Sequence, residues 1–491
     1  MKARHDDVNG IDETVTAADR AFHRAAEASP AARREWLRAV ADALEAHRPE
    51  LVALAEEETH LAQARLNGEL TRTAFQLRFL GDEIVEGSHL GATIDHADPS
   101  WGMGPRPDLR SIRQAIGVVA VFGASNFPFA FSVAGGDSAS ALAAGCAVVH
   151  KAHPAHPRLA RRTAGLVVEA LLSAGAPTGL FALVEGQEEG VRLVRHPLVK
   201  AVGFTGSTRG GRALFDLVSA RPEPIPFYGE LGSTNPVFVT PRAWELRGAA
   251  IAEGYLDSVA LGRGQFCTKP GFLVAPAAAG AAAAIADTAR RRGDAPALML
   301  TPHLRESFEQ SLDALAAHDG FVTVVGGPSE AAEAPLTVLR VAAETVLAAP
   351  EILEHEAFGP ASVVVEYSDE AQLGALAAVI GGQLTSTVHG EPDDDVAPLL
   401  ATLAERSGRV LWNGWPTGVT VSYAQQHGGP YPAATTDTTS VGAAAVTRFQ
   451  RPVAYQDLPQ DLLPPGLRDD NPLQIPQRVD GVLMTPKGTT R

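Results

Sequence analysis

The stretch Gly117-Val118-Val119-Ala120-Val121-Phe122 is a short apolar run followed by a glycine and a polar turn. Three runs of the same kind follow it, at Ala147 to His150, Phe181 to Glu185 and Ala201 to Thr205. Ala-rich segments with helical character, such as Leu159 to Ser173, separate these runs. Alternating strands and helices predict a parallel sheet covered on both faces. Doubly wound sheets of this kind bind their ligands where the strands end.

Helices are expected ahead of this sheet. Ser29-Pro30 combines an N-cap residue with proline at the first helical position. Apolar residues between Leu37 and Leu44 then recur at i, i+3, i+4 and i+7, which predicts an amphipathic helix. A second helical stretch is expected from about Ala62 to Val85.

A second α/β series follows Pro236. Its expected strands are Gly271 to Val274, Phe321 to Val325, Ser362 to Glu366 and Leu384 to Val388. Its expected helices lie near 277–291, 303–317, 369–380 and 394–406. The proline-rich C-terminal segment predicts an extended tail over the surface or over a neighbouring subunit.

The composition limits the class of protein. A chain of 491 residues is long enough for two or more domains. The net charge of −16 argues against nucleic acid or an anionic membrane as the main partner. The sequence has only two cysteines, no apolar run long enough to span a bilayer, and no apolar N-terminal stretch typical of a signal peptide. We therefore expect a cytoplasmic protein with reduced thiols.

Three residues in separate segments supply the groups needed for acyl chemistry at a carbonyl carbon. Cys267, in Gly264-Gln265-Phe266-Cys267-Thr268, is a candidate nucleophile, and Glu230, in Glu230-Leu231-Gly232, is a candidate base. Asn126, at the end of the first apolar strand, is a candidate amide donor to an oxyanion. Each alone has an ordinary structural interpretation: a core thiol, a solvated glutamate or a turn-capping asparagine.

The surroundings of these residues suggest how they are tuned. Glu230 follows an apolar segment, so desolvation is expected to raise its pKa toward the range of a general base. Cys267 needs a base or a positive potential to become a thiolate. Arg263 and Lys269 could lower the Cys267 pKa or attract a substrate carboxylate, or they could point away. Cys146, within an apolar segment, is interpreted as a core residue.

A glycine-bearing turn follows the strand that ends at Thr205. The turn Gly206-Ser207-Thr208-Arg209-Gly210-Gly211 would present backbone N–H groups and a helix N-terminus to a phosphate. Lys151 ends another strand and could reach a ribose or phosphate. The spacing of His150, His153 and His156 invites a metal site, but prolines interrupt the segment and no further ligand pattern accompanies it, so no metal is predicted.

Taken in order, these motifs resemble the aldehyde dehydrogenase superfamily over almost the whole chain. The resemblance implies that Cys267 is the nucleophile, Glu230 the general base and Asn126 the oxyanion donor. It also implies a set of cofactor-binding positions: Lys151 at the adenosine ribose, Pro154 beyond it, Gly206, Ser207 and Gly211 at the phosphate turn, and Glu356 with Phe358 at the nicotinamide ribose.

The resemblance implies a three-part α/β fold. A Rossmann-like cofactor-binding domain would comprise residues 1–99 and 118–235, and an α/β catalytic domain residues 236–446. Residues 100–117 and 447–491 would form a bridging and oligomerisation element that joins subunits as a homodimer or homotetramer. In that element the segment near 100–117 would pair with a strand around Thr447 to Tyr455.

Further segments are similar to one branch of the family, the 2-oxoglutarate semialdehyde dehydrogenases. They include Lys151 to Pro157, His427-Gly428-Gly429-Pro430-Tyr431-Pro432 and Leu467 to Leu473. NAD-preferring members often carry a glutamate three residues after the cofactor lysine, where this chain has Pro154. With no carboxylate to repel a 2′-phosphate, NADP is the expected cofactor and NAD remains possible. The candidate counter-charges are Lys151, Arg158, Arg192 and Arg195.

The predicted reaction is NAD(P)-dependent oxidation of an aldehyde to a carboxylate through a cysteine thiohemiacetal and a thioester. The expected substrate is 2-oxoglutarate semialdehyde. The alternatives are an NADP-dependent medium- or long-chain fatty aldehyde dehydrogenase, an acylating enzyme that passes the thioester to another acceptor, and a non-catalytic cofactor-binding protein on the same fold. A cysteine hydrolase is disfavoured because no motif brings a histidine near Cys267.

Overall fold

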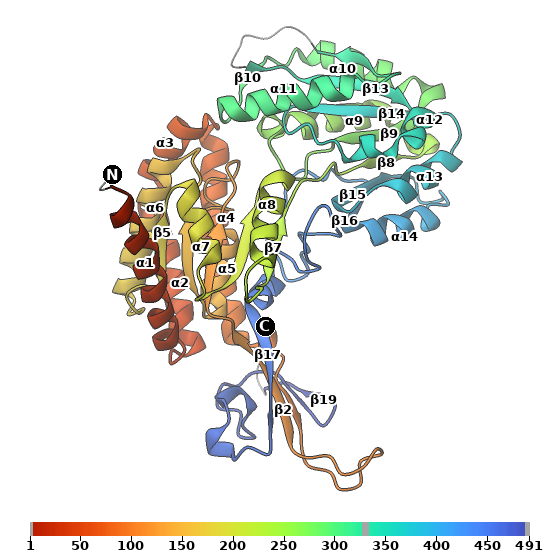
Figure 1. Ribbon diagram of the computed structural model, residues 1–491. Helices are drawn as coiled ribbons and strands as arrows, with labels where there is room; N and C mark the ends of the chain where they lie inside the picture. Colours follow the sequence, from red (N-terminus) through yellow and green to blue (C-terminus); the bar gives the residue numbers. More distant parts are fainter. Residues whose placement is uncertain (1–2, 327–332, 487–491) are drawn as a thin grey trace.

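The computed structural model describes residues 3–326 and 333–486. Figure 1 shows two α/β parts side by side and a small sheet that projects away from both. No helix in the described ranges is long and apolar enough to cross a membrane.

The first part is built on a five-stranded parallel sheet with the order β5-β4-β3-β6-β7. The four predicted strands are confirmed, and a fifth, β7, extends the sheet and ends at the candidate base. The strands in spatial order are β5 (Phe181–Val184), β4 (Ala147–Lys151), β3 (Val118–Phe122), β6 (Val199–Thr205) and β7 (Phe227–Glu230). Because β3 lies at the centre, all five of its residues are buried.

Helices cover both faces of this sheet (Figure 1). The predicted N-cap at Ser29 is confirmed, since its side chain accepts a hydrogen bond from the Ala32 amide and Pro30 begins the helix. The helices of this part are α1 (Ala3–Ala25), α2 (Pro30–Ala46), α3 (Arg48–Thr59), α4 (Gln63–Glu86), α5 (Gly136–Ala144), α6 (Pro157–Ser173), α7 (Gln187–Arg195) and α8 (Thr208–Ser219). Their apolar faces share one buried core with the strands, and Cys146 lies in it as predicted.

The second part contains a seven-stranded sheet with the order β11-β13-β14-β9-β8-β15-β16, parallel except for the edge strand β11. The four predicted strands are present, and β8, β13 and β16 were missed because they are short or interrupted by polar residues. The strands are β8 (Val237–Val239), β9 (Phe272–Pro276), β11 (Val322–Val325), β13 (Thr337–Ala342), β14 (Ala361–Tyr367), β15 (Gln383–His389) and β16 (Ser407–Trp412). Beside it, β10 (Ala297–Leu298) pairs with β12 (Glu333–Ala334).

The helices of this part pack on the seven-stranded sheet (Figure 1). The four predicted helical segments are confirmed, and α9 and α12 were not predicted. The α-helices are α9 (Pro241–Ala260), α10 (Ala281–Arg292), α11 (Pro302–Ala316), α12 (Ala343–Ala348), α13 (Ala371–Val379) and α14 (Ala397–Arg406). This stretch of the chain also contains short 3₁₀ helices, namely η2 (Leu261–Gly264), η3 (Ala277–Ala279), η4 (Pro350–Glu354) and η5 (Ala443–Phe449).

The third sheet has the order β17-β2-β1-β18-β19 and projects from the body (Figure 1). The predicted pairing of the segment before Gly117 with a late strand is confirmed, because β2 (Leu109–Ala115) and β17 (Gln450–Gln456) form an antiparallel ladder. The proline-rich tail is not simply extended. After η6 (Gln460–Leu462) and η7 (Pro465–Leu467), it returns as β18 (Gln477–Val479) and β19 (Val482–Met484). There β18 pairs with β1 (Thr93–Asp95), which follows η1 (Ser88–Leu90).

Candidate active site

Three elements from the two α/β parts bring the candidate catalytic residues together. Glu230 is the last residue of β7, and Asn126 lies in the loop between β3 and α5. Cys267 follows η2, where Gly262 and Gly264 adopt positive φ. A Cβ on Gly264 would lie 2.1 Å from the Gly359 carbonyl oxygen, so only glycine allows this close approach.

A histidine that the sequence analysis did not assign to the site stands between Cys267 and Glu230. His427 Nε2 lies 2.8 Å from Glu230 Oε1 and 3.7 Å from Cys267 Sγ. Ser440 Oγ donates to the other carboxylate oxygen of Glu230 at 2.8 Å. No sequence motif places a histidine near Cys267, but a loop far along the chain carries His427 into the site.

The expected rise in the Glu230 pKa is also wrong. Burial raises the pKa of Glu230, but the attraction of His427 and the hydrogen bonds from His427 and Ser440 outweigh it, so the pKa lies below its ordinary value. Glu230 is therefore ionised and able to accept a proton. Its side chain is almost completely buried, which keeps bulk water away from the carboxylate.

The positive charge of Arg409 lowers the pKa of the Cys267 thiol, but other effects outweigh it. Burial raises the pKa of Cys267 well above its ordinary value, and the nearby carboxylate of Glu230, which accepts a hydrogen bond from the thiol, raises it further. The resting sulfur is therefore protonated. Since a thiol reacts as its thiolate, the site must remove this proton through the adjacent base.

Asn126 is buried beside the nucleophile. Its Nδ2 donates to the Gln265 carbonyl at 2.9 Å, which fixes the amide two residues before Cys267. An amide has two N–H donors, and this hydrogen bond uses one of them. The other is then able to serve an oxygen atom bound near Cys267.

A pocket of about 630 Å³ connects the candidate catalytic residues to the carboxyl ends of the first sheet. Eight of the predicted site residues line it: Asn126, Pro154, Gly206, Ser207, Glu230, Cys267, Glu356 and Phe358. Lys151 lies at the end of β4 outside this lining, and burial lowers its pKa. Gly211 packs behind the wall, where a Cβ would lie 2.1 Å from Leu231 Cδ2.

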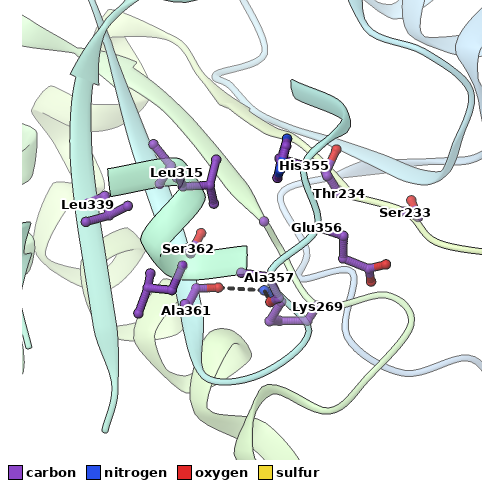
Figure 2. A pocket seen from close by; sticks show the side chains of 13 residues that line it. Ser233, Thr234, Lys269, Leu315, Leu339, His355, Glu356, Ala357, Ala361 and Ser362 are labelled. Atoms are coloured by element: carbon purple, nitrogen blue, oxygen red, sulfur yellow. Dashed lines mark hydrogen bonds between the residues drawn. The ribbon is translucent and has the colours of Figure 1, made fainter. Parts of the chain in front are cut away.

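Glu356 is half-buried and lies near the buried Lys269 on the same pocket wall (Figure 2). Lys269 Nζ donates to the Ala361 carbonyl at 2.5 Å and to the Ala357 carbonyl at 2.9 Å, so it ties together the loop that carries Glu356. Burial raises the pKa of Glu356 to about 7, and the positive charge of Lys269 opposes that rise. The Lys269 ammonium group is thus held by hydrogen bonds to this loop.

Arg263 also turns away from the sulfur and donates to the Leu298 carbonyl. Of the alternatives for Arg263 and Lys269, the structure supports the one in which both point away from the substrate.

Two other arginines, Arg65 and Arg72 on α4, line a second pocket that also reaches Cys267. The predicted helix was correct, but its pattern did not show that these side chains face the nucleophile.

His150 in β4 and His153 and His156 after it have separate structural roles. His150 Nδ1 is hydrogen-bonded to Ser138 Oγ at 3.1 Å, while the rings of His153 and His156 stack at 5.7 Å. Among the described residues, the group that could hold a metal ion is instead Glu230, Cys267 and His427, whose ligand atoms lie within 4.8 Å of one another.

Comparison with known proteins agrees with this geometry. Residues 1–448 match the model of the aldehyde dehydrogenase family. The chain belongs to the aldehyde dehydrogenase family. It is therefore an oxidoreductase that acts on an aldehyde, and its fold provides for NAD(P).

Two curated relatives are similar over most of their length. The alpha-ketoglutaric semialdehyde dehydrogenase of Acinetobacter baylyi is 43% identical over 96% of this chain and 91% of its own. The alpha-ketoglutaric semialdehyde dehydrogenase 2 of Azospirillum brasilense is 44% identical over 92% and 87%, respectively.

A solved member of the family shares the fold at low identity. Aldehyde dehydrogenase C of Pseudomonas syringae, in complex with NAD⁺ and octanal, aligns with a TM-score of 0.76 at 22% identity. The alignment covers 91% of this chain and 89% of that protein. The predicted aldehyde dehydrogenase fold is thereby confirmed.

Proposed function

We propose that the protein oxidises 2-oxoglutarate semialdehyde to 2-oxoglutarate, with NADP⁺ as its preferred cofactor. The observation that carries the substrate is the 43–44% identity, over more than nine-tenths of the chain, to two proteins named for this reaction. The site geometry supplies the chemistry of the family: a thiol, a base and an amide donor around one pocket.

Attack on the aldehyde begins with removal of the thiol proton. Glu230 accepts the proton from Cys267. His427 stabilises this pair of side chains through its contacts with both. The thiolate forms a bond to the carbonyl carbon and gives a thiohemiacetal. The Asn126 amide and the Cys267 backbone N–H then donate to the carbonyl oxygen, on which negative charge develops.

The cofactor pocket fits a dinucleotide. α8 begins at the pocket wall with Ser207 as its N-cap, so the first amides of this helix point toward an anionic phosphate. Gly232 allows a close approach, since a Cβ there would lie 2.5 Å from Glu356 Oε2. Glu356 and Phe358 would hold the nicotinamide end beside Cys267. A bound NAD(P)⁺ would supply the hydride acceptor for the thiohemiacetal carbon, and Cys267 would then carry a thioester.

Hydrolysis of the thioester returns the enzyme to its resting form. Glu230 first releases the proton of Cys267 to solvent and then takes a proton from a water molecule, whose hydroxide adds to the acyl carbon. The C–S bond breaks to release the carboxylate, and the Cys267 thiolate regains a proton from Glu230. A base at this position favours water over another acyl acceptor. Product analysis with and without coenzyme A separates this proposal from an acylating enzyme.

Several groups near the adenosine end favour NADP⁺. Pro154 lines the pocket and brings no carboxylate that would repel a 2′-phosphate. Arg209, at the start of α8, also lines it and adds a cation to the candidate counter-charges. Arg158 is less suited, because its guanidinium donates to Glu57 at 2.5 Å.

We also propose that the three predicted domain ranges act as the cofactor, catalytic and bridging units, and that the bridging sheet joins subunits. The edge strand β19 pairs only with β18 among the described strands, and Val482, Leu483 and Met484 are all more than half exposed. An exposed apolar edge strand readily pairs with another chain. A homodimer or homotetramer in the cytoplasm, where both free thiols stay reduced, fits these features.

The deciding experiment is steady-state kinetics on 2-oxoglutarate semialdehyde, hexanal and decanal, each with NADP⁺ and NAD⁺. We expect the highest kcat/KM with 2-oxoglutarate semialdehyde and NADP⁺. Cys267→Ala should abolish oxidation and leave cofactor binding nearly unchanged. A strong preference for decanal would instead support a fatty aldehyde dehydrogenase. No reduction of cofactor with any aldehyde would support a non-catalytic protein.

A further inference from the structure

The second pocket at Cys267 has the features of an anion site. Its volume is about 190 Å³, and its wall includes Phe127, Phe131, Phe266 and two arginines of α4, Arg65 and Arg72. A cavity of about 150 Å³ admits a molecule the size of benzene, so this pocket suits a short substrate. It lacks Glu356 and the phosphate turn, which line the cofactor pocket instead.

The two guanidinium groups have unused donors. Among the described residues, Nη1 and Nη2 of Arg72, and Nε and Nη1 of Arg65, are buried without a hydrogen-bond partner. The remaining donors are occupied: Arg72 Nε donates to the Val419 carbonyl at 3.4 Å and Arg65 Nη2 to the Asn126 carbonyl at 2.5 Å. A buried donor without a partner destabilises the protein unless a ligand satisfies it.

Aromatic rings hold these guanidinium groups in place. Arg72 lies 5.0 Å from the ring centroid of Phe131, and Arg65 lies 4.6 Å from that of Phe266. Both arginines line the same pocket as Cys267. Stacking fixes the orientation of each guanidinium while leaving its edge available for a planar carboxylate.

One acidic residue shares this wall. Glu69 lies between the two arginines on α4, and its Oε1 accepts hydrogen bonds from the Phe129 and Ala130 amides at 2.8 and 2.9 Å. These bonds hold Oε1 on the backbone, whereas Oε2 has no hydrogen-bond partner among the described residues and the Glu69 carboxylate attracts both arginines. Two arginines against one glutamate leave the pocket with a positive balance, and Arg409 adds a further cation that acts on Cys267.

We propose that Arg72, with Arg65 beside it, binds the carboxylate at the far end of the substrate while Cys267 attacks its aldehyde. This inference rests on the proposed function and deepens it, because it assigns specificity for ω-carboxylated aldehydes to two named residues. The carboxylate would accept hydrogen bonds from the unpaired Nη atoms of Arg72. An aldehyde that ends in a methyl group would leave these donors buried and unsatisfied.

The test compares aldehydes of equal length that differ at the far end. kcat/KM is measured for 2-oxoglutarate semialdehyde, for 5-oxopentanoate, which lacks the keto group, and for pentanal, which lacks the carboxylate. We expect Arg72→Met to lower kcat/KM for both acids at least tenfold more than for pentanal, and Arg65→Met to act in the same direction. Arg72→Lys, which keeps the charge, should recover part of the selectivity.

Arg78→Met is the matched control. Arg78 lies on the same helix but pairs with Asp42 at 2.6 Å on the surface, so its loss removes the same charge without touching the pocket. The ratio of kcat/KM for acid to that for pentanal should stay at the wild-type value in this variant. A similar fall of this ratio in the control would mean that net charge, rather than carboxylate binding by Arg72 and Arg65, sets the preference for acids.

The outcomes separate the two levels of inference. Suppose that wild-type enzyme oxidises 2-oxoglutarate semialdehyde but the Arg72 and Arg65 variants lose kcat/KM for all three aldehydes by the same factor. The proposed carboxylate binding by these arginines is then wrong, and the proposed function stands. Suppose instead that wild-type enzyme prefers 5-oxopentanoate to pentanal, that this preference depends on Arg72, and that 2-oxoglutarate semialdehyde is not oxidised. Carboxylate binding by Arg72 then stands, and the proposed substrate is wrong.

Discussion

His427 Nε2 lies 2.8 Å from Glu230 Oε1, and this contact makes the glutamate part of a buried hydrogen-bonded group rather than an isolated base. The same nitrogen lies 3.7 Å from Cys267 Sγ, so one ring contacts both reacting side chains. This arrangement explains how the Cys267 thiol, with its raised pKa, can still act as a nucleophile, because the thiol proton has the ionised Glu230 carboxylate next to it.

Replacing His427 should change both the rate and its pH dependence. We expect His427→Ala to lower kcat by about 10²-fold, as for loss of a group that assists proton transfer. Because His427 holds the Glu230 pKa down, its removal should raise that pKa and move the acidic limb of the kcat–pH profile to higher pH. Steady-state kinetics from pH 5.5 to 9 measures both effects.

His427→Gln provides the matched comparison. Glutamine can donate to Glu230 but cannot carry a proton as imidazole does, so the acidic limb should return toward the wild-type position while kcat stays low. An unmoved acidic limb in both variants would show that His427 does not set the ionisation of Glu230.

The three candidate catalytic residues could be found from the sequence because each stands in a short local motif. His427 could not be assigned in this way, since it lies 160 residues beyond Cys267 in the chain. The adjacent glycines gave a signal: a Cβ on Gly429 would lie 2.1 Å from the Gln383 carbonyl oxygen, and one on Gly428 2.6 Å from that of Thr438. A loop that threads so closely past other backbone is held in one position, and it brings His427 with it.

The role of α4 shows a similar limit. The helix expected from about Ala62 to Val85 is confirmed as α4. Arg65, Glu69 and Arg72 also follow helical spacing, and such a charged stripe normally faces solvent. Here the second α/β part covers it, because Phe266 and Val419 pack over the arginines. Contacts between parts that fold from distant segments cannot be inferred from one helix pattern.

The positive charge of Lys269 near Glu356 should control the strength of cofactor binding. In Lys269→Met, the carbonyls of Ala357 and Ala361 lose their donor, and the pKa of Glu356 should rise above about 7. A protonated Glu356 accepts hydrogen bonds from ribose hydroxyls less well than the carboxylate. We expect the Kd for NADP⁺ at pH 7.5 to increase about tenfold, as measured by fluorescence titration.

A double-mutant cycle checks that the effect of Lys269 passes through Glu356. In a Glu356→Gln background, Lys269→Met should weaken NADP⁺ binding by a smaller factor, with a coupling free energy of about 0.5–3 kcal/mol. Equal losses in both backgrounds would mean that Lys269 supports only the loop backbone.

Zinc should inhibit the enzyme at its own nucleophile. The ligand atoms of Cys267, His427 and Glu230 lie within 4.8 Å of one another, and thiolate, imidazole and carboxylate are the ligands that Zn²⁺ prefers. A bound ion would occupy the nucleophile and the base together. We expect added ZnCl₂ to stop turnover, EDTA to restore it, and EDTA treatment alone to leave activity unchanged. Loss of activity on chelation would instead indicate a required metal.

Buried neutral histidines should make the fold sensitive to mild acid. Burial lowers the pKa of His89 and of His150 to about 3, whereas both titrate near 6.5 in an unfolded chain. The unfolded state therefore binds more protons below pH 6.5, so their contribution to stability is complete above that pH and is lost as the pH falls toward 3. Between pH 7 and 5, each such histidine should lower the free energy of unfolding by about 2 kcal/mol.

Urea unfolding of wild-type protein and of His89→Gln at pH 7, 6 and 5 measures this effect. Neither ring nitrogen of His89 has a partner among the described residues, so glutamine removes the titrating group without breaking a hydrogen bond recorded there. We expect the midpoint of the variant to fall less steeply between pH 7 and 5. His23→Gln serves as the control, because the His23 side chain is 71% exposed and its loss should leave the wild-type slope. Equal slopes in all three proteins would place the acid sensitivity elsewhere in the fold.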